Sequence, residues 1–247
     1  MPTIFNIPVQ AESAWKPDFS HQRAMHAILF CAWEASDPAL AVQIHQMPVK
    51  PFSQALRRID DQLGWRVALL DDRLSESLLT GLGRLNDVKI MEHPVQFRLD
   101  QLTTVHKPYA SLVAAKPQSK YRFQFDTPTT FRQGNLSHPM PDPYLCVQSW
   151  WTRWNQFAPP EHQINAAALD VAHAHLAISH FNMGSQTWSD GQRRYVGGVG
   201  RMSFHVMQAR KLADAWWQAL ATLVAFGPFC GTGYKTTQGM GQTAVLN

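Results

Sequence analysis

The chain has 247 residues, of which 45% are hydrophobic, and a formal net charge of +4. This length can bury one large core or two smaller ones, and the small basic excess favours partners that carry phosphate groups. Three scattered cysteines without a C-x-x-C pair argue against a disulfide framework or a cysteine-rich zinc site, and they predict a protein of the reducing cytoplasm. No signal-peptide pattern opens the chain and no apolar run reaches about eighteen residues, so we expect no membrane segment and no membrane partner.

The first half shows strand and helix patterns in the order strand, helix, strand, strand, helix, strand. This order is typical of the split βαβ, or ferredoxin-like, arrangement. In chain order the predicted elements are a strand over residues 3–10, a helix capped by Ser20, a short helix that begins at Asp37 and Pro38, two strands around Gly64 within 52–70, a helix over 71–85 and a strand over 87–105.

The second half can be drawn with the same outline, although no sequence repeat links the halves. Its predicted elements are a strand over 121–128, a helix over 143–157, strands over 170–188 and 192–207 that join at a turn over 189–191, a helix over 211–226 and a last strand over 243–246. The proline-containing segment 106–119 could link the halves. We therefore predict an α+β protein with two domains, residues 1–112 and 118–247.

A glycine-rich segment before the last strand reads G-x-G-x5-G-x-G, with Gly231, Gly233, Gly239 and Gly241 as its glycines. Such loops tolerate positive φ, approach other groups closely and can expose N–H groups to anions. The segment is not a P-loop, because Tyr234 separates Gly233 from the lysine, and a dinucleotide fingerprint needs the opposite order of strand and helix. Phosphate binding and simple packing both remain open. The intervening polar residues are Lys235, Thr236, Thr237 and Gln238.

At this loop the sequence resembles the CRISPR-associated repeat-processing endoribonucleases of the RAMP superfamily. These proteins carry a C-terminal G-φ-G-x5-G-φ-G loop in which φ is usually hydrophobic; Met240 fits this pattern and Thr232 departs from it. Further blocks match in the expected order over nearly the whole chain. They are SHQRAMHAILFCAWEASDPALAVQIHQMPVKPFS, FDTPTTFRQGN with the following WWTRWNQF helix, and YVGGVGRMSFHV.

The resemblance implies two tandem ferredoxin-like (RRM-like) domains that hold CRISPR repeat RNA, as precursor and as mature product, along a shared basic face. It also implies cleavage without a metal or another cofactor, in which the ribose 2′-OH attacks the adjacent phosphate and leaves a 2′,3′-cyclic phosphate and a 5′-OH. Such chemistry needs a base, an acid and a cation near the phosphorane. The resemblance leaves open whether the protein forms a homodimer or joins other CRISPR effector subunits.

The resemblance also points to the catalytic groups. His45 matches the family's histidine at the end of the second helical segment, and Lys50 matches the lysine before the next strand, where it could stabilise the phosphorane. A position at which some members carry tyrosine is Phe30 here, which cannot transfer a proton. His26, with Arg23 one turn earlier on the same helix, could fill this role. We expect His45 and His26 to form the acid–base pair, with Arg23 or Lys50 on the phosphate, and we leave open which histidine is the base.

Two alternatives accompany this interpretation. The missing tyrosine leaves room for a non-catalytic RNA-binding subunit. A metal-dependent hydrolase is the third hypothesis, because His173 and His175 fall on one face of a predicted strand, a spacing that can bind zinc. Further basic residues could line a track for RNA phosphates, although solvated surface charge is the simpler interpretation of each one. They are Arg132, Arg193 and Arg194, together with Lys116, Lys120, Arg122 and Arg201.

Overall fold

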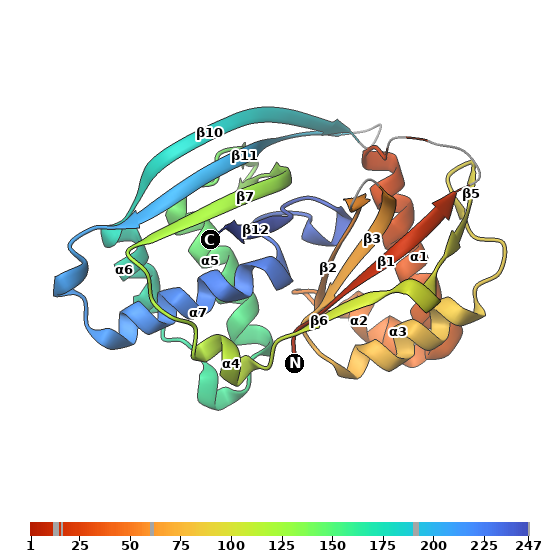
Figure 1. Cartoon of the computed structure of the whole chain (residues 1–247), viewed down its shortest axis with the longest axis horizontal. Coiled ribbons are helices and arrows are strands. Elements are labelled where there is room, and N and C mark those ends of the chain that lie inside the picture. Colours follow the sequence, from red (N-terminus) through yellow and green to blue (C-terminus); the bar gives the residue numbers. More distant parts are fainter. Residues whose placement is uncertain (12–14, 16, 60–61, 190–192, 247) are drawn as a thin grey trace.

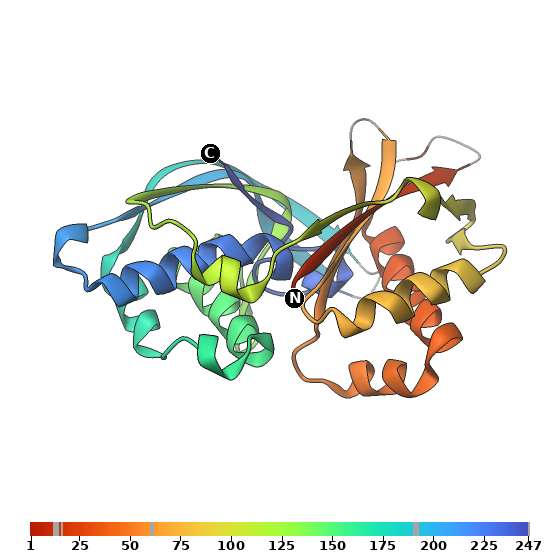
Figure 2. The same ribbon diagram turned by 60° about the horizontal axis from the view of Figure 1, so that its bottom comes forward.

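The computed structural model describes residues 1–11, 15, 17–59, 62–189 and 193–246. Its strands form two main β-sheets, one from each half of the chain, and helices pack against one face of each sheet (Figure 1). Turning the molecule by 60° shows the two sheet-and-helix units side by side again (Figure 2). The predicted α+β class is confirmed. Across the described residues, no helix has the length and apolar character needed to cross a membrane.

The first unit has β1 at the centre of its sheet. Its elements are β1 (Thr3–Ala11), α1 (Phe19–Ser36), α2 (Pro38–Gln46), β2 (Phe52–Ile59), β3 (Gln62–Leu69), α3 (Arg73–Arg84), β4 (Lys89–Ile90), β5 (His93–Phe97) and β6 (Thr103–His106). The strand order is β2-β3-β1-β5-β4, and β6 also pairs with β1. Helices α1 and α3 pack on each other and on the sheet, where they bury Trp33, Leu78 and Trp65 in one apolar cluster.

The main sheet of the second unit shares part of this strand order. Its elements are α4 (Tyr109–Val113), β7 (Lys120–Thr129), β8 (Phe131–Gln133), β9 (Leu136–His138), α5 (Pro143–Phe157), α6 (Ala167–His175), β10 (Leu176–Ser189), β11 (Arg194–Val206), α7 (Asp214–Cys230) and β12 (Thr243–Leu246). Its main sheet has the order β10-β11-β7-β12, while β8 and β9 form a separate pair. In both units the first strand lies between the third and the last, as it does in β2-β3-β1-β6.

Helix starts in the first unit follow their capping residues. The break at Asp37 and Pro38 is confirmed, with an Asp37 carboxylate oxygen accepting from Leu40 N–H at 3.0 Å. The prediction that Ser20 caps α1 is wrong by two residues. Asp18 is the cap, because its carboxylate accepts from the backbone N–H groups of Ser20 and His21, and the His21 ring completes a capping box.

Three predicted turns or connections differ from the structure. Gly64 lies inside β3, opposite Pro8 and Arg57, so the predicted turn there is wrong; the two strands meet at 60–61, outside the described residues. The predicted strand over 87–105 is three short strands and a 3₁₀ turn. The segment 106–119 contains α4 and is therefore not a simple linker. The breaks within 87–105 are not visible in local alternation, because the positions of β5 and β6 are set by their pairing with β1.

The other differences lie in the second unit. The predicted strand over 170–188 is wrong at its start, since 167–175 form α6, an alanine-rich stretch with high helix propensity. The strand continues to Ser189, the first residue of the turn predicted over 189–191, and the other two residues of that turn lie outside the described residues. The last helix begins at Asp214 and continues to Cys230, later at both ends than the prediction.

Buried polar contacts join the two units. Helix α7 packs against β2 and β3 as well as against its own sheet. The buried Arg66 guanidinium donates to the Pro228 carbonyl and, at 3.0 Å, to the Gln242 side-chain oxygen, and burial lowers the pKa of Arg66 to about 9. The Ser53 hydroxyl donates to the Phe229 carbonyl at 3.0 Å. Since a buried polar group is costly without its partner, these bonds favour one fixed placement of the units.

Candidate active site

Two histidines from neighbouring helices meet at one phenylalanine ring. His26 on α1 and His45 in the last turn of α2 both pack against Phe30, at ring-centroid distances of 5.1 Å and 5.4 Å. Phe30 follows His26 by one helical turn, and the break at Asp37 folds α2 back so that His45 reaches the same ring. His26 is half-buried and His45 is exposed. The structure thus places the predicted pair together, with Phe30 in contact with both rings.

The glycine-rich loop fixes the ring of His26. Its Nδ1 lies 2.9 Å from the carbonyl oxygen of Thr237. A carbonyl oxygen only accepts, so Nδ1 carries a proton and the lone pair of the neutral ring is on Nε2. Burial lowers the pKa of His26; the bond to Thr237 opposes this, and the charges of His45, Lys50 and Lys235 lower the pKa further. Near neutral pH, His26 is therefore a neutral imidazole with Nε2 free to take a proton.

Lys50 closes the end of α2. Its ammonium group donates to the carbonyl oxygens of His45 at 2.7 Å and Met47 at 2.6 Å. Partial burial lowers the pKa of Lys50. An ammonium group has three N–H donors, so one remains for an oxygen placed beside His45. Lys50 can therefore both hold the His45 backbone and meet a phosphate.

The loop itself lies between the two units, and most of its amides are bonded inside the protein. Its 3₁₀ turn, Thr236–Gln238, packs on α1 and β2. Thr232 N–H donates to the Gly241 carbonyl at 2.8 Å, and Gly233 N–H donates to the Ser149 hydroxyl at 2.8 Å. These amides are not available to a phosphate. The predicted backbone anion site is therefore limited to the rest of the loop, around Thr237.

Two of the glycines are required by close packing. Gly239 has φ +85°, and a Cβ there would lie 2.5 Å from the side-chain oxygen of Gln22 on α1. Gly241 has φ +66°, and a Cβ there would lie 2.0 Å from the Thr232 carbonyl oxygen. Both positions combine a left-handed backbone with no room for a side chain. The packing interpretation of the motif therefore holds for these glycines, whatever the loop also binds.

A Gly241→Ala variant is expected to lose about 2 kcal/mol or more of its free energy of unfolding, because the added methyl group meets a backbone oxygen and φ is positive. Urea denaturation measures this loss. Gly83→Ala is the matched control: Gly83 lies in α3 with nothing within 4 Å of an added Cβ. There alanine is expected to raise the free energy of unfolding by about 0.5–1 kcal/mol. Equal stabilities of the two variants would contradict the packing requirement.

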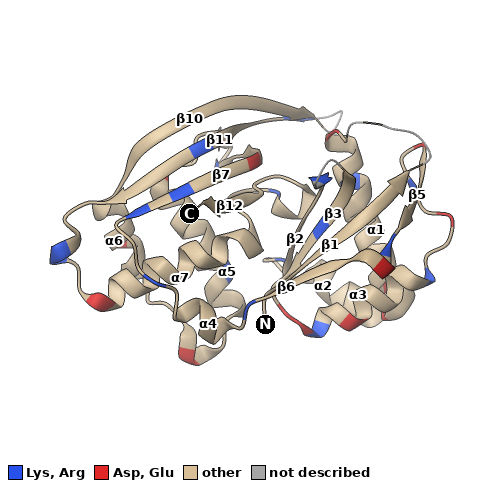
Figure 3. Ribbon diagram, in the orientation of Figure 1, with Lys and Arg blue, Asp and Glu red and all other residues tan. Residues whose placement is uncertain are grey.

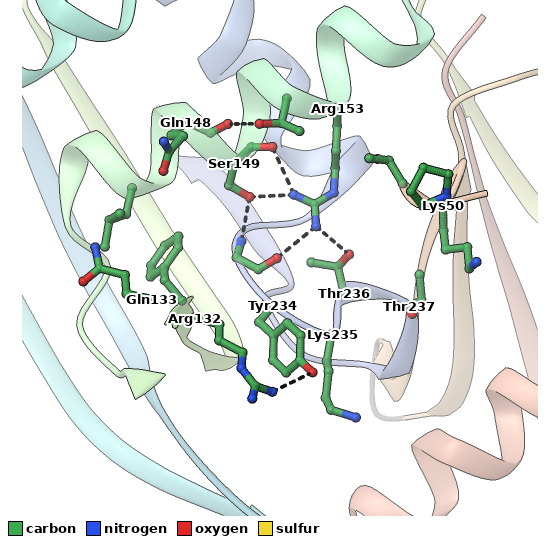
Figure 4. A pocket seen from close by; sticks show the side chains of 16 residues that line it. Lys50, Arg132, Gln133, Gln148, Ser149, Arg153, Tyr234, Lys235, Thr236 and Thr237 are labelled. Carbon is green, nitrogen blue, oxygen red and sulfur yellow. Dashed lines mark hydrogen bonds between the residues drawn. The ribbon is translucent and has the colours of Figure 1, made fainter. Parts of the chain in front are cut away.

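A cavity of about 400 Å³ opens beside the loop (Figure 4). Its lining joins the segment after α2, which includes Lys50, to β8, α5 and the loop. Arg153 on α5 reaches across to the loop and donates to the Gly233 carbonyl at 2.9 Å and the Thr236 hydroxyl at 3.3 Å. Burial lowers the pKa of Arg153. No motif marks this arginine in the sequence, where its only signal is a charged residue inside the aromatic WWTRWNQF helix.

Several predicted RNA-binding residues gather around two tyrosine rings. The Arg132 guanidinium lies over the Tyr234 ring at 5.8 Å, and the Lys235 ammonium lies over the Tyr195 ring at 4.7 Å and donates to the Gln238 side chain at 2.7 Å. Tyr195 follows Arg194 on β11 and packs against Phe19 at the start of α1. The end of the β10–β11 hairpin, with the exposed Arg193 and Arg194, therefore lies next to the loop. On α1, Arg23 is exposed one turn before His26.

Other basic residues follow the open face of the second sheet. Lys120 and Arg122 on β7 are exposed, and Arg201 on β11 donates to the Gln124 side chain at 3.1 Å across the ladder. Figure 3 shows basic positions on β7 and β11. Along β7 they alternate with the buried Tyr121 and Phe123, so their side chains lie on the face of the sheet away from the core. Like charges on one face favour an extended polyanion as ligand.

The expected placement of His173 and His175 on one face of a strand is wrong. Both lie on α6, where residues two apart point in different directions. His173 packs edge-on against Tyr144, and a ring nitrogen of His175 lies 3.2 Å from the Met207 carbonyl oxygen. Within the part of the chain that the structure describes, no group of three or more His, Cys, Asp or Glu side chains could hold a metal ion.

Comparisons with known proteins extend over most of the chain. The profile of the family described as CRISPR-associated endoribonuclease Cas6 matches residues 123–243. A CRISPR-associated endoribonuclease Cas6 of Mycobacterium tuberculosis is 27% identical over 232 residues, which cover 90% of this chain and 70% of the relative. One from Streptococcus thermophilus is 23% identical over 201 residues, covering 80% and 81%.

Solved structures share the fold. A Cas6 structure described as a product complex superimposes with a TM-score of 0.84 at 23% identity, covering 100% of both chains. Thermus thermophilus Cas6 gives a TM-score of 0.75 at 24% identity, covering 100% of this chain and 98% of the other. Sequence and fold similarities therefore point the same way, to the Cas6 family of CRISPR-associated endoribonucleases.

Proposed function

We propose that this protein is a metal-independent endoribonuclease that binds CRISPR repeat RNA and cuts the precursor by attack of a ribose 2′-OH on the adjacent phosphate. The products are a 2′,3′-cyclic phosphate and a 5′-OH end. One observation carries the proposal. The Thr237 carbonyl accepts from Nδ1 of His26, which leaves Nε2 to take a proton, and His26 and His45 both pack against the Phe30 ring. Two positioned imidazoles suit an acid–base reaction that needs no metal.

We infer a role for each group in this reaction. Nε2 of His26 takes the proton of the 2′-OH, whose oxygen then forms the new bond to phosphorus. The bond from phosphorus to the 5′-oxygen breaks, and the imidazolium of His45 gives its proton to that oxygen. The remaining N–H donor of Lys50 faces the charge that builds up on the phosphorane. We assign His26 as the base because its half-buried ring is neutral, and the exposed His45 as the acid.

We also infer that each unit is a ferredoxin-like domain, residues 1–112 and 118–247, and that repeat RNA lies along their basic faces. The shared strand order of the two sheets supports the first point. The charges on β7 and β11 support the second. Helix α4 bridges the domains, since Tyr109 packs on Trp154 and donates to the Leu70 carbonyl at 2.9 Å.

A cleavage assay on a synthetic repeat from the same genome tests the function. We expect one cut, a fragment that ends in a cyclic phosphate, and full activity in EDTA. A single 2′-deoxy substitution before the cut should abolish cleavage, because it removes the nucleophile. Binding without any cut would favour the non-catalytic RNA-binding subunit, for which Phe30 at the tyrosine position is the motivating observation. Loss of activity in EDTA would refute the metal-free reaction.

The pH dependence of the rate tests the assignment of His26 as base. Its pKa is lowered, first by burial, and a general base acts in its unprotonated form. The rate is therefore expected to persist as the pH falls through the usual range of histidine, and to decline only at more acidic pH. Lys235→Gln removes a charge that lowers this pKa, so the acidic limb should move to higher pH. Arg122→Gln, on the distant β7, is the control; identical limbs in both variants would contradict the assignment.

A further inference from the structure

The cavity beside the loop is a built pocket, and of its lining residues the proposed chemistry uses Lys50 alone. Its volume of about 400 Å³ is within the range of pockets that bind one small ligand. Residues from three separate parts of the chain line it: the segment after α2, the stretch from β8 to α5, and the glycine-rich loop. Figure 4 shows their side chains converging on one space.

The charge of the lining selects an anionic ligand. Of the sixteen described residues that line the cavity, none is Asp or Glu, and the cations are Lys50, Arg132, Arg153 and Lys235. The hydrogen bonds described for Arg153 go to neutral oxygens, namely Ser149 O at 3.0 Å, the Ser149 hydroxyl, Gly233 O and the Thr236 hydroxyl. The guanidinium is thus fixed in place with its charge uncompensated by a carboxylate. Such a preorganised cation favours an anion.

The remaining lining suits a nucleobase. Tyr234 offers an aromatic ring, and base–aromatic stacking is a sequence-tolerant source of RNA affinity. Gln133, Gln148 and Thr152 add side chains that can both donate and accept hydrogen bonds. Arg132 and Lys235 lie 5.8 Å and 5.7 Å from the centre of the Tyr234 ring, so the pocket offers cations, a ring and amides together, which suits the phosphate and the base of a nucleotide.

The position of the pocket in the chain links it to the nucleotide whose 5′-oxygen leaves when the RNA is cut. His45 and the lining residues Pro48, Val49 and Lys50 belong to one short chain segment. In the proposed reaction His45 protonates the 5′-oxygen of the nucleotide that follows the cut. In an in-line attack, the leaving nucleotide lies opposite the attacking 2′-OH and opposite His26, the general base that deprotonates it. The nucleotide next to His45 is therefore the one that can enter the pocket.

We propose that this cavity is a subsite for the nucleotide immediately 3′ of the scissile phosphate. Arg153 and Lys235 hold its backbone charge, Tyr234 stacks on its base, and Gln133 and Gln148 contact the base edge. The proposal rests on the proposed function, which defines the cut. It assigns to α5 and β8 a part in positioning the leaving group.

The test uses three repeat RNAs and three proteins. The RNAs are the intact repeat, one with an abasic ribose immediately 3′ of the mapped cut, and one with an abasic ribose three nucleotides further on. The proteins are the wild type, Thr152→Trp, which fills the pocket, and Gln156→Trp, which places the same ring on α5 outside the lining. Single-turnover rates at subsaturating protein are compared.

We expect the adjacent abasic ribose to slow the wild type and Gln156→Trp about tenfold, and the distant one to have no effect. Thr152→Trp should be slow on the intact RNA and show no further loss on the adjacent abasic RNA. Equal wild-type rates on the intact and adjacent abasic RNAs would overturn the subsite while leaving the nuclease proposal intact. An equal abasic penalty in wild type and Thr152→Trp would also overturn it.

If the wild type cuts no RNA, the nuclease proposal fails, and photo-crosslinking decides the subsite separately. 4-Thiouridine is scanned through a repeat RNA, and the cross-linked peptides are identified by mass spectrometry. A single nucleotide that cross-links to Tyr234 or Gln148, and is lost in Thr152→Trp, would support a nucleotide pocket. Cross-links that avoid the lining at every position would reject it.

Discussion

Replacing His45 with alanine is expected to slow cleavage of the repeat about a hundredfold or more, while the affinity for the RNA changes less than about threefold. The imidazole gives the proton that the departing 5′-oxygen needs, and an alkoxide without that proton is a poor leaving group. His45 is exposed and makes its ring contact with Phe30, so its removal leaves the core of the first unit in place. Single-turnover rates and filter binding on the same RNA separate chemistry from affinity.

A second measurement identifies His45 as the acid. An RNA whose leaving 5′-oxygen is replaced by sulfur needs no proton on departure, because a thiolate is a good leaving group. The His45→Ala variant should therefore recover most of its rate on this substrate. His173→Ala, an exposed histidine on α6, is the control and should cleave both RNAs as the wild type does. If His45→Ala cuts the ordinary RNA at the wild-type rate, His45 has no part in the reaction.

Local signals predicted those parts of the fold that depend on neighbouring residues. The Asp37–Pro38 break is confirmed because a carboxylate cap and a proline at the first helical position act within one turn. The sequence patterns also predicted the helix over 143–157 and the last strand over 243–246, which the structure has as α5 and β12. The strand predicted over 170–188 was wrong over 170–175, where the surrounding alanines favour a helix.

The candidate site was only partly predictable, because its contacts join distant parts of the chain. The motif context placed His26 and His45 together, and the structure adds why His26 differs: its partner, Thr237, lies 211 residues away in the sequence. Arg153 carries no motif, and its place in the cavity depends on the packing of α5 against the loop. Sequence spacing cannot report a contact of this kind before the fold is known.

Replacing His26 with alanine should reduce the cleavage rate by about a hundredfold or more, since the base that activates the 2′-OH is lost. This result alone is ambiguous, because the same ring also donates to the Thr237 carbonyl and contacts Phe30 and Phe52. Alanine could misplace the loop rather than remove the chemistry. A variant that keeps the hydrogen bond without the base is therefore needed.

His26→Asn provides it. The asparagine amide places an N–H donor near the position of Nδ1, so it can keep the bond to Thr237, while nothing occupies the position of Nε2. We expect His26→Asn to bind RNA and unfold in urea like the wild type, yet to cleave as slowly as His26→Ala. Recovery of most of the rate in His26→Asn would make His26 a positioning residue that holds the loop, and the base would have to be sought elsewhere. If the fold and the affinity of His26→Asn are intact and its rate stays low, the lost activity belongs to Nε2 of the neutral, half-buried imidazole. At the 2′-OH, the histidine and asparagine side chains differ only by that atom.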